Sequence, residues 1–303
     1  AYSIFDNTYF TLDRSSSLIE LPQLADWLIR WAIEVGSEIS ITDLNHYCAS
    51  ETFCVQDVLF LSGIRTENHS WEIGDDIWFG DLSLIKNKDL RCSVQKNSAM
   101  QSFSPPISAV LVKDRTVPRN HLSSSDLDNR NVENYRELAE PVNEQIRKLH
   151  DAHLSLVLSR KGGCGAQTVA FSTVIPENNI GSTFSTYIQL GHRVAQSENN
   201  WITLEATKAA SIHDLFRKLP ELDQNRLRVA IGKLNEAAAG HFHDTNSAVA
   251  LRTAMECLFT ANRENGTSHK IATRAAVFMA TDIDERRKKQ KATKKAYGIC
   301  SNA

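Results

Sequence analysis

The sequence predicts an α+β fold, in which a mixed α/β region over residues 1–200 is followed by an all-α helical bundle over residues 201–303. All five tryptophans and six of the seven prolines lie at or before position 201. Beyond that point only Pro220 remains, and alanine, lysine and arginine become frequent, a composition that favours helix. A chain of 303 residues is long enough for two domains.

The first region begins with an amphipathic helix and continues with short apolar segments. Residues 20–35 predict the helix, because Leu24, Leu28 and Trp31 recur at helical spacing. Apolar runs bounded by turn residues then predict strands. The predicted strands cover residues 55–62, 76–85, 107–113, 153–158, 167–174 and 184–190.

Three further segments complete this region. Residues 132–150 predict a helix that Pro141 kinks or breaks. Residues 114–131 are rich in polar and charged side chains and predict a long loop. The glycine-rich stretch "SRKGGCGA" at 159–166 predicts the flexible loop of a hairpin, joining the strands on either side of it.

The second region has the pattern of four helices. An apolar stripe that includes Leu227 and Ala238 precedes Gly240, a residue typical of a helix end. Asp282 and Glu285 stand three positions apart, as in a capping box at a helix start. The short connections predict that consecutive helices are antiparallel neighbours. The residues expected to begin the four helices are Asp223, Asp244, Ser268 and Asp282.

The overall composition limits the partners and the cellular compartment that we expect for this protein. A net charge of −2 and a pI of about 6.6 do not demand nucleic acid or an anionic membrane as a partner, so a basic surface must be local. No window approaches the roughly 20 apolar residues that a membrane span needs, and the N-terminal residues lack the pattern of a secretory signal. The six cysteines are scattered, which indicates free thiols in a reducing compartment. We therefore expect a cytoplasmic protein.

The last predicted helix carries seven cations within ten residues. A basic helix face of this kind can follow a phosphate backbone. Alternatively it is a solvated face, with Asp282, Asp284 and Glu285 favourably placed at the positive end of the helix dipole. The cations are Arg286, Arg287, Lys288, Lys289, Lys291, Lys294 and Lys295.

The candidate metal ligands in this sequence do not match the motifs of known metal sites. The stretch "HYCASETFC" places His46, Cys48 and Cys54 within nine residues, but it lacks the four ligands and the spacing of a structural zinc site. His241 and His243 follow the helix-ending glycine and are expected in an exposed loop. We therefore expect no metal and no cofactor.

A buried carboxylate and two thiols are further candidates for chemistry. Glu256 lies in an otherwise apolar helix, where an ion pair with Arg274 across the bundle is the default expectation. Cys164 or Cys300 could serve as the nucleophile of a thiol enzyme with a distant histidine, although nothing in the spacing recommends it.

A succession of short phrases near the end of the chain is more informative. Asp244 opens a helix that runs into "TAMECLF", and the next helix carries Arg274 in the phrase "RAA". A charged helix start follows at Glu285 and Arg286, and then Tyr297. Together these phrases resemble the Apea-like branch of the HEPN domains, over about residues 223–303.

The resemblance implies a dimer of four-helix bundles that cleaves transfer RNA or messenger RNA without metal. The family motif uses an arginine to stabilise charge on the phosphate and a histidine to move protons or position the 2′-hydroxyl. Aligned on Tyr297, the motif places Cys300 in the arginine slot and Ser301 at the motif serine, followed by Asn302, and its histidine would fall just past Ala303.

Three explanations of the altered motif stay open. The chain is part of a longer protein, the domain is catalytically degenerate, or Arg286, Arg287 or Asn302 replaces the arginine, because a cysteine cannot hold phosphate charge as a guanidinium does. The candidate catalytic residues are Cys300, Ser301, Asn302 and Glu256. The candidate nucleic-acid-binding residues are Arg274, Arg286, Arg287, Lys291 and Lys294.

Two functions follow as expectations from the resemblance. The first is an anti-phage defence protein, homodimeric through its C-terminal bundle, with residues 1–200 as sensor or regulator. Its C-terminal bundle is a HEPN-type ribonuclease effector, and a phage protein is its trigger or inhibitor. The alternative is a degenerate HEPN-like module that serves dimerisation and binding of a protein or nucleotide. Cys300 and the absent histidine are the sequence features that separate the two.

Overall fold

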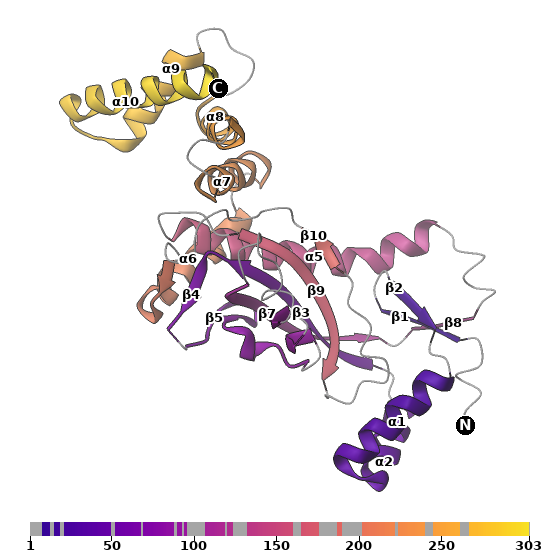
Figure 1. Ribbon diagram of the computed structural model, residues 1–303. Coiled ribbons are helices and arrows are strands. Elements are labelled where there is room, and N and C mark those ends of the chain that lie inside the picture. Colours follow the sequence, from indigo (N-terminus) through magenta and orange to yellow (C-terminus); the bar gives the residue numbers. More distant parts are fainter. Residues whose placement is uncertain are drawn as a thin grey trace.

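A six-stranded sheet forms the centre of the computed structural model (Figure 1). Its strand order is β10-β9-β3-β7-β6-β5, and all neighbours are antiparallel. The strands are β3 (Thr52–Ser62), β5 (Trp71–Gly74), β6 (Ile77–Gly80), β7 (Ala109–Pro118), β9 (Gly165–Ile175) and β10 (Tyr187–Gln189). The structure describes residues 8–12, 15–18, 21–49, 52–67, 69–87, 90–92, 94–95, 107–118, 120–123, 132–159, 165–175, 187–189, 202–221, 224–239, 245–260 and 267–302.

Strand β3 is buried on both faces, which explains its continuous apolar sequence. Leu59 and Leu61 pack on one face of the sheet, while Val58 and Phe60 pack on the other, because successive side chains of a strand alternate. Helices α5 (Val132–Leu158) and α6 (Ala209–Lys218) cover the first face. The second face is covered by the 3₁₀ helix η2 (Leu82–Leu84) and by residues that follow it, Ile85, Leu90 and Val94.

The predicted strand at 153–158 is wrong, because these residues form the last turns of helix α5. Every side chain from residue 151 to residue 157 is buried. A helix buried on all sides has the same continuous apolar run as a buried strand, so the pattern cannot separate them. The hairpin loop predicted at 159–166 is therefore also wrong, because this segment connects helix α5 to strand β9 and not two strands. Pro141 lies inside α5 and does not end it.

The other predicted strands of the first region are confirmed in full or in part. Residues 55–62, 107–113 and 167–174 lie in strands, and β10 covers part of 184–190. Strand β6 occupies the first part of 76–85 and η2 the rest. The polar loop predicted at 114–131 is wrong over its first part, where β7 continues to Pro118. Residues 124–131 lie outside the described residues.

A small second sheet has the order β2-β1-β8 and antiparallel pairing. Its strands are β1 (Thr8–Leu12), β2 (Ser15–Leu18) and β8 (Asn120–Ser123). The predicted N-terminal helix is confirmed as α1 (Leu21–Val35), which forms a hairpin with α2 (Ser37–Ala49). Gly36 has φ of +96°, the left-handed conformation that favours glycine after a helix end, and its N–H donates to Ala32 O over 3.0 Å.

The sheet core includes residues from both sides of position 200. Strand β11 (Ile202–Leu204) pairs in parallel with β4 (Ile64–Thr66). The 3₁₀ helices η4 (Ala206–Lys208) and η5 (Leu219–Glu221) flank α6. The side chains that this segment contributes to the core are Leu204, Ile212, Phe216 and Leu219.

Four helices follow, as predicted, and the mixed α+β fold class is confirmed. They are α7 (Gln224–Ala239), α8 (Thr245–Phe259), α9 (Thr267–Met279) and α10 (Ile283–Asn302). Helix α7 packs on α8, and α10 packs on both α9 and α8. The expected first residues Asp223 and Asp244, and Gly240, lie outside the described residues, whereas Ser268 lies one residue inside α9.

A buried ion pair joins the sheet region to these helices. Arg228 of α7 forms a bidentate pair with the Asp151 carboxylate of α5, through Nη1 with Oδ1 and through Nη2 with Oδ2, the latter at 2.8 Å. The side chains are only 15% and 4% exposed. Planar bidentate geometry is the arrangement in which a guanidinium satisfies a carboxylate best.

We expect Arg228→Ala to lower the free energy of unfolding by about 3 kcal/mol or more, because it leaves the Asp151 carboxylate buried without its guanidinium. The matched control is Lys233→Ala, which removes a half-exposed pair with Glu236 at 2.6 Å and should cost less than about 1 kcal/mol. Urea denaturation followed by circular dichroism measures both variants. Equal losses of unfolding free energy in the two variants would show that the buried pair contributes no more to stability than the half-exposed pair.

Candidate functional site

The start of α10 is fixed by Asp282. Its carboxylate accepts the N–H groups of Asp284 at 2.9 Å and Glu285 at 3.0 Å, as expected for a helix cap. These hydrogen bonds, that of Glu285 first, lower the pKa of Asp282 despite an opposing effect of desolvation. The predicted helix start is therefore confirmed, and the acidic residues stand at the positive end of the helix dipole.

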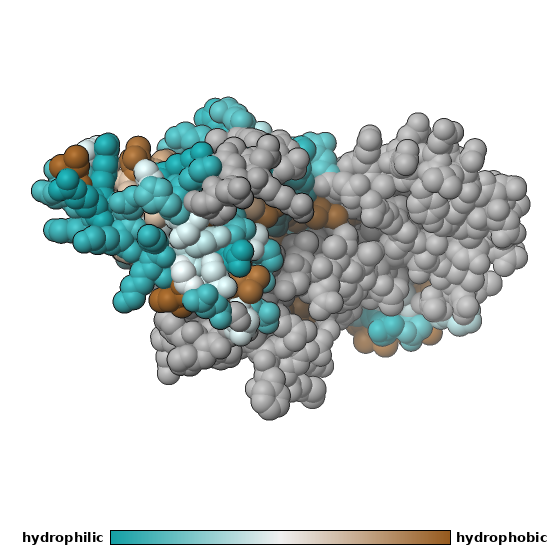
Figure 2. All heavy atoms as spheres, turned by 90° about the horizontal axis from the view of Figure 1, so that it is seen from above, coloured by the Kyte–Doolittle hydropathy of each residue, from teal (hydrophilic) through white to brown (hydrophobic). Residues whose placement is uncertain are grey.

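The candidate nucleic-acid-binding residues of α10 fall into two groups. Arg286 is half-buried, and its Nε donates to Ala280 O over 2.8 Å, where α9 has ended. Arg287 forms an exposed pair with Asp284 at 3.3 Å, which adds little to stability. Lys291 and Lys294 are exposed on the helix surface. Figure 2 shows a largely hydrophilic surface over the C-terminal helices, with separate hydrophobic patches.

Arg274 lies on α9 and does not pair with Glu256 as expected. Its Nη1 donates to Phe259 O, at the end of α8, over 2.6 Å. The Glu256 carboxylate is instead paired with Arg252 and Tyr297. Arg274 thus connects α9 to α8 while its side chain remains exposed beside the C-terminal helices.

Arg252, Glu256 and Tyr297 form a polar cluster between α8 and α10. Glu256 Oε1 accepts both Arg252 Nε at 2.9 Å and the Tyr297 hydroxyl at 2.6 Å. The Arg252 guanidinium also lies 5.7 Å from the centre of the Tyr297 ring, in a cation–π contact. Because Nε faces Glu256 and the side chain is 43% exposed, the cluster holds a guanidinium at the surface in a fixed orientation.

The hydrogen bonds between the three side chains of this cluster shift their pKa values. Desolvation raises the pKa of Glu256, but the hydrogen bonds from Tyr297 and Arg252 together outweigh it, and the net pKa is lowered. Desolvation and the hydrogen bond to Glu256 raise the pKa of Tyr297. The hydrogen bond to Glu256 is the main cause of the raised pKa of Arg252. At neutral pH the cluster therefore contains a carboxylate, a neutral phenol and a guanidinium.

The candidate catalytic residues at the end of α10 are only partly brought together. Ser301 stands one turn after Tyr297, and its hydroxyl donates to Tyr297 O over 2.8 Å. Cys300 is buried, with 7% exposure, whereas Asn302 is exposed. Ser301 thus adjoins the Tyr297–Glu256 pair through the helix backbone, while the Cys300 thiol is withdrawn from the surface.

Arg252 is the residue of this cluster that the sequence interpretation missed. The signal that could have found it is the spacing of Arg252 and Glu256, four residues apart on one helix, which places the two side chains side by side. A guanidinium is the group that the family motif requires and that Cys300 cannot supply.

The described part of the chain offers neither a metal site nor a membrane span. No group of three or more histidine, cysteine or acidic side chains there could hold a metal ion, and no described helix is long and apolar enough to span a membrane. His46 on α2 and Cys54 on β3 are exposed, while His241, His243 and Cys164 lie outside the described residues. The described cysteines Cys54, Cys92, Cys257 and Cys300 are free thiols.

A scan against protein-family models, a search of curated proteins and a search of solved structures each found no match. The resemblance to HEPN domains therefore rests on the sequence phrases near the C-terminus, and the geometry of the cluster is independent of it.

We expect Glu256 to make the C-terminal helices acid-sensitive. Its lowered folded-state pKa means that its contribution to stability is complete at neutral pH, above the usual pKa of a glutamate, and is lost as the pH falls through the lower folded-state pKa. Thermal unfolding measured from pH 7 to pH 3 should show a smaller acid-induced drop in melting temperature for Glu256→Gln than for the unmodified protein. Glu236→Gln, on the surface of α7, is the matched control and should keep the full drop.

Proposed function

We propose that helices α7–α10 form a HEPN-type effector that acts on transfer RNA or messenger RNA without metal, in an anti-phage defence protein. The observation that carries the proposal is the Arg252–Glu256–Tyr297 cluster, which holds a guanidinium at the surface between α8 and the strongly basic α10. A fixed surface guanidinium and a row of exposed cations are what a protein needs to bind a phosphate backbone.

The basic helix supplies the electrostatic part of RNA binding. Arg287, Lys291 and Lys294 are exposed and recur at intervals of four and three residues, so they share one face of α10. Residues 267–302 contain nine basic and three acidic residues, although the whole chain has a net charge of −2. Such a local concentration of positive charge attracts a polyanion and makes its affinity salt-dependent.

Arg252 supplies the charge-stabilising part of cleavage. When the 2′-hydroxyl of RNA attacks the adjacent phosphate, negative charge grows on the phosphate oxygens, and a preorganised guanidinium stabilises it. The hydrogen bond from Nε to Glu256 orients Arg252, and the Tyr297 hydroxyl holds Glu256 in place. Ser301 and Asn302 lie in the last turn of α10, where their polar groups can bind the ribose or phosphate.

The same helices support homodimerisation. Large apolar side chains remain exposed on α7 and α8, which is expected of a face that a second subunit covers. They are Val229, Leu234, Val249 and Leu258. In this proposal the sheet region, which the Asp151–Arg228 pair joins to α7, is the sensor that responds to a phage protein.

A second candidate function is a non-catalytic module of the same kind, which dimerises and binds a protein or a nucleotide. The burial of Cys300 in the arginine slot of the motif favours it, because neither the thiol chemistry nor the position replaces the family arginine.

Removing two exposed cations tests RNA binding. We expect the double variant Lys291→Gln, Lys294→Gln to bind RNA more weakly and to flatten the plot of log affinity against log salt by about 1.4, or roughly 0.7 for each phosphate that the variant no longer neutralises. The control is Lys208→Gln with Lys218→Gln, two exposed lysines on η4 and α6. Fluorescence anisotropy with a labelled single-stranded RNA measures both, and equal behaviour of the two variants would exclude α10 as the RNA-binding face.

Cleavage is tested with transfer RNA and messenger RNA in the presence of EDTA. We expect specific cuts, and Arg252→Gln should slow them by about 10²–10³-fold, the usual effect of losing one charge-stabilising group. Arg226→Gln, an exposed position on α7, is the control and should cleave at the normal rate. A folded protein that binds RNA and never cleaves it, with or without a candidate phage trigger, would support the non-catalytic module instead.

A further inference from the structure

Two helical hairpins of this chain carry opposite charge. The acidic hairpin, α1–α2, spans residues 21–49 and contains four acidic residues and one basic residue. The basic hairpin, α9–α10, spans residues 267–302 and contains nine basic and three acidic residues. A positive and a negative surface of this size attract one another over distances comparable with the Debye length, about 8 Å at physiological salt.

Both hairpins also expose large apolar side chains, which a charged surface alone does not require. Ile33 is 81% exposed on α1, and Phe278 is 83% exposed on α9. The other exposed apolar side chains are Ile29, Ile39 and Ile41 on the acidic hairpin, and Val277, Met279, Ile283 and Ile299 on the basic hairpin. Exposed apolar side chains that gather within charged surroundings are typical of a protein-binding surface.

Charge and apolar side chains share faces on these helices. On α1, Asp26, Ile29 and Ile33 lie at intervals of three and four residues and form one stripe. Arg30 on the same helix pairs with Asp26, and the exposed acid beside Ile33 is Glu34. Ile283, Arg287 and Lys291 form a similar stripe on α10. The two stripes therefore match in character, with apolar groups beside acids on one hairpin and apolar groups beside cations on the other.

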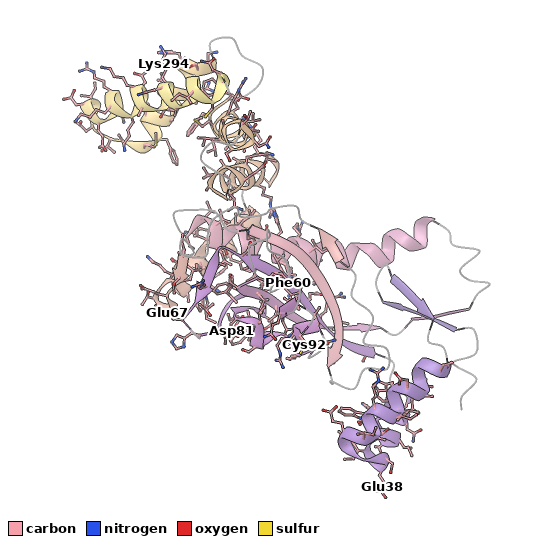
Figure 3. The ribbon with its side chains drawn as sticks, viewed as in Figure 1. Glu38, Phe60, Glu67, Asp81, Cys92 and Lys294 are labelled. Carbon is pink, nitrogen blue, oxygen red and sulfur yellow. The ribbon has the colours of Figure 1, made fainter. Side chains whose placement is uncertain are left out.

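We propose that the acidic hairpin of one copy of this chain docks on the basic hairpin of a second copy. A second copy is the fitting partner because this chain itself carries both complementary surfaces. Figure 3 shows Glu38 on the acidic hairpin and Lys294 on the basic hairpin at opposite ends of the molecule, so the two surfaces meet between chains. Such a contact joins two different surfaces, and repeating it builds a ring or an open filament.

The proposed contact has a consequence for RNA. It covers the same cations that the proposed function assigns to the phosphate backbone, so self-association and RNA binding compete. The contact is separate from the α7–α8 face proposed for the homodimer. Assembly through the hairpins therefore continues beyond two copies and is weakened by salt, whereas a dimer formed by apolar side chains is not.

The experiment measures mass against protein concentration for the full chain and for two charge-reversed variants, by light scattering after size exclusion at low salt. One variant carries Asp26→Lys, Glu34→Lys and Glu38→Lys, and the other carries Arg287→Glu, Lys291→Glu and Lys294→Glu. We expect the unmodified chain to grow in mass with concentration, and each variant alone to lose this growth, with self-affinity at least about tenfold weaker. Mixing the two variants should restore association, because each then supplies the charge that the other reversed.

Matched controls separate a specific contact from general attraction. A third variant, Glu67→Lys, Asp214→Lys and Glu221→Lys, changes the net charge equally at exposed positions outside both hairpins. It should self-associate normally. When it is mixed with the Arg287, Lys291 and Lys294 variant, that variant can dock only through its intact acidic hairpin, so it should cap the assemblies and should not restore their growth in mass. Ile33→Ser, at a position where the native residue is 81% exposed, should also weaken self-association and should leave the circular dichroism spectrum unchanged.

Three results would overturn the proposal: an unmodified chain whose mass stays constant with concentration, growth that survives both reversals, or addition of the Arg287, Lys291 and Lys294 variant that extends assemblies of the third variant as much as it extends those of the first. Failure of RNA binding is read separately, from the anisotropy of labelled RNA, and leaves these outcomes unchanged. If both RNA binding and self-association occur, added single-stranded RNA should return the assembly to the smaller species.

Discussion

The buried pair between Asp151 and Arg228 determines how the two regions of the chain can cooperate. Asp151 lies on α5, the helix that covers the central sheet, and Arg228 lies on α7, the first of the C-terminal helices. A carboxylate that is 4% exposed is costly unless a partner satisfies it, so the pair tolerates little displacement of α7 relative to α5. A rearrangement of the sheet region that moved α5 would therefore be passed to α7, as the proposed sensor and effector roles require.

The C-terminal helices pack closely but bury little apolar surface. The buried side chains on their contact faces are mostly alanines: Ala230, Ala250, Ala254, Ala272, Ala275 and Ala276. Small side chains let helices approach, yet each contributes little hydrophobic free energy. The Arg252–Glu256–Tyr297 cluster adds hydrogen bonds between α8 and α10 in compensation. Several larger apolar side chains stay exposed, among them Val249, Leu258 and Phe278, which is consistent with helices that complete their packing against further subunits.

The parts of the fold that followed from sequence are those set by local patterns. The continuous run at β3 predicts a strand because side chains on both faces are buried, and Asp282 predicts a helix start because its carboxylate has N–H groups within reach. The strand predicted at 153–158 was wrong because a fully buried helix, here the end of α5, has the same continuous apolar sequence as a buried strand. The sheet of β1, β2 and β8 was missed because all three strands are short and two of them, β2 and β8, are largely polar.

In the candidate site, too, local sequence spacing predicts some contacts, whereas others arise only from tertiary packing. Arg252 and Glu256 are neighbours through spacing on one helix, but choosing Arg252 over Arg274 as the partner depends on how α8 and α9 are rotated against each other, which no local pattern encodes. The Tyr297 hydroxyl reaches Glu256 across 41 positions of sequence, so that contact exists only through tertiary packing. Cys300 was judged by its place in a motif, whereas its burial is a property of the side of α10 that faces its neighbours.

Under the two proposals above, one set of cations on α10 is available to two anionic partners. RNA offers closely spaced phosphates, and the acidic hairpin of a second copy offers carboxylates beside exposed isoleucines. Because both partners bind the same face, each lowers the apparent affinity of the other by the same factor. An effector stored as an assembly would keep its phosphate-binding face covered until RNA or a trigger displaced the acidic hairpin. Binding at α1–α2 would then regulate α10 through mass action alone, without a conformational signal passing through the sheet.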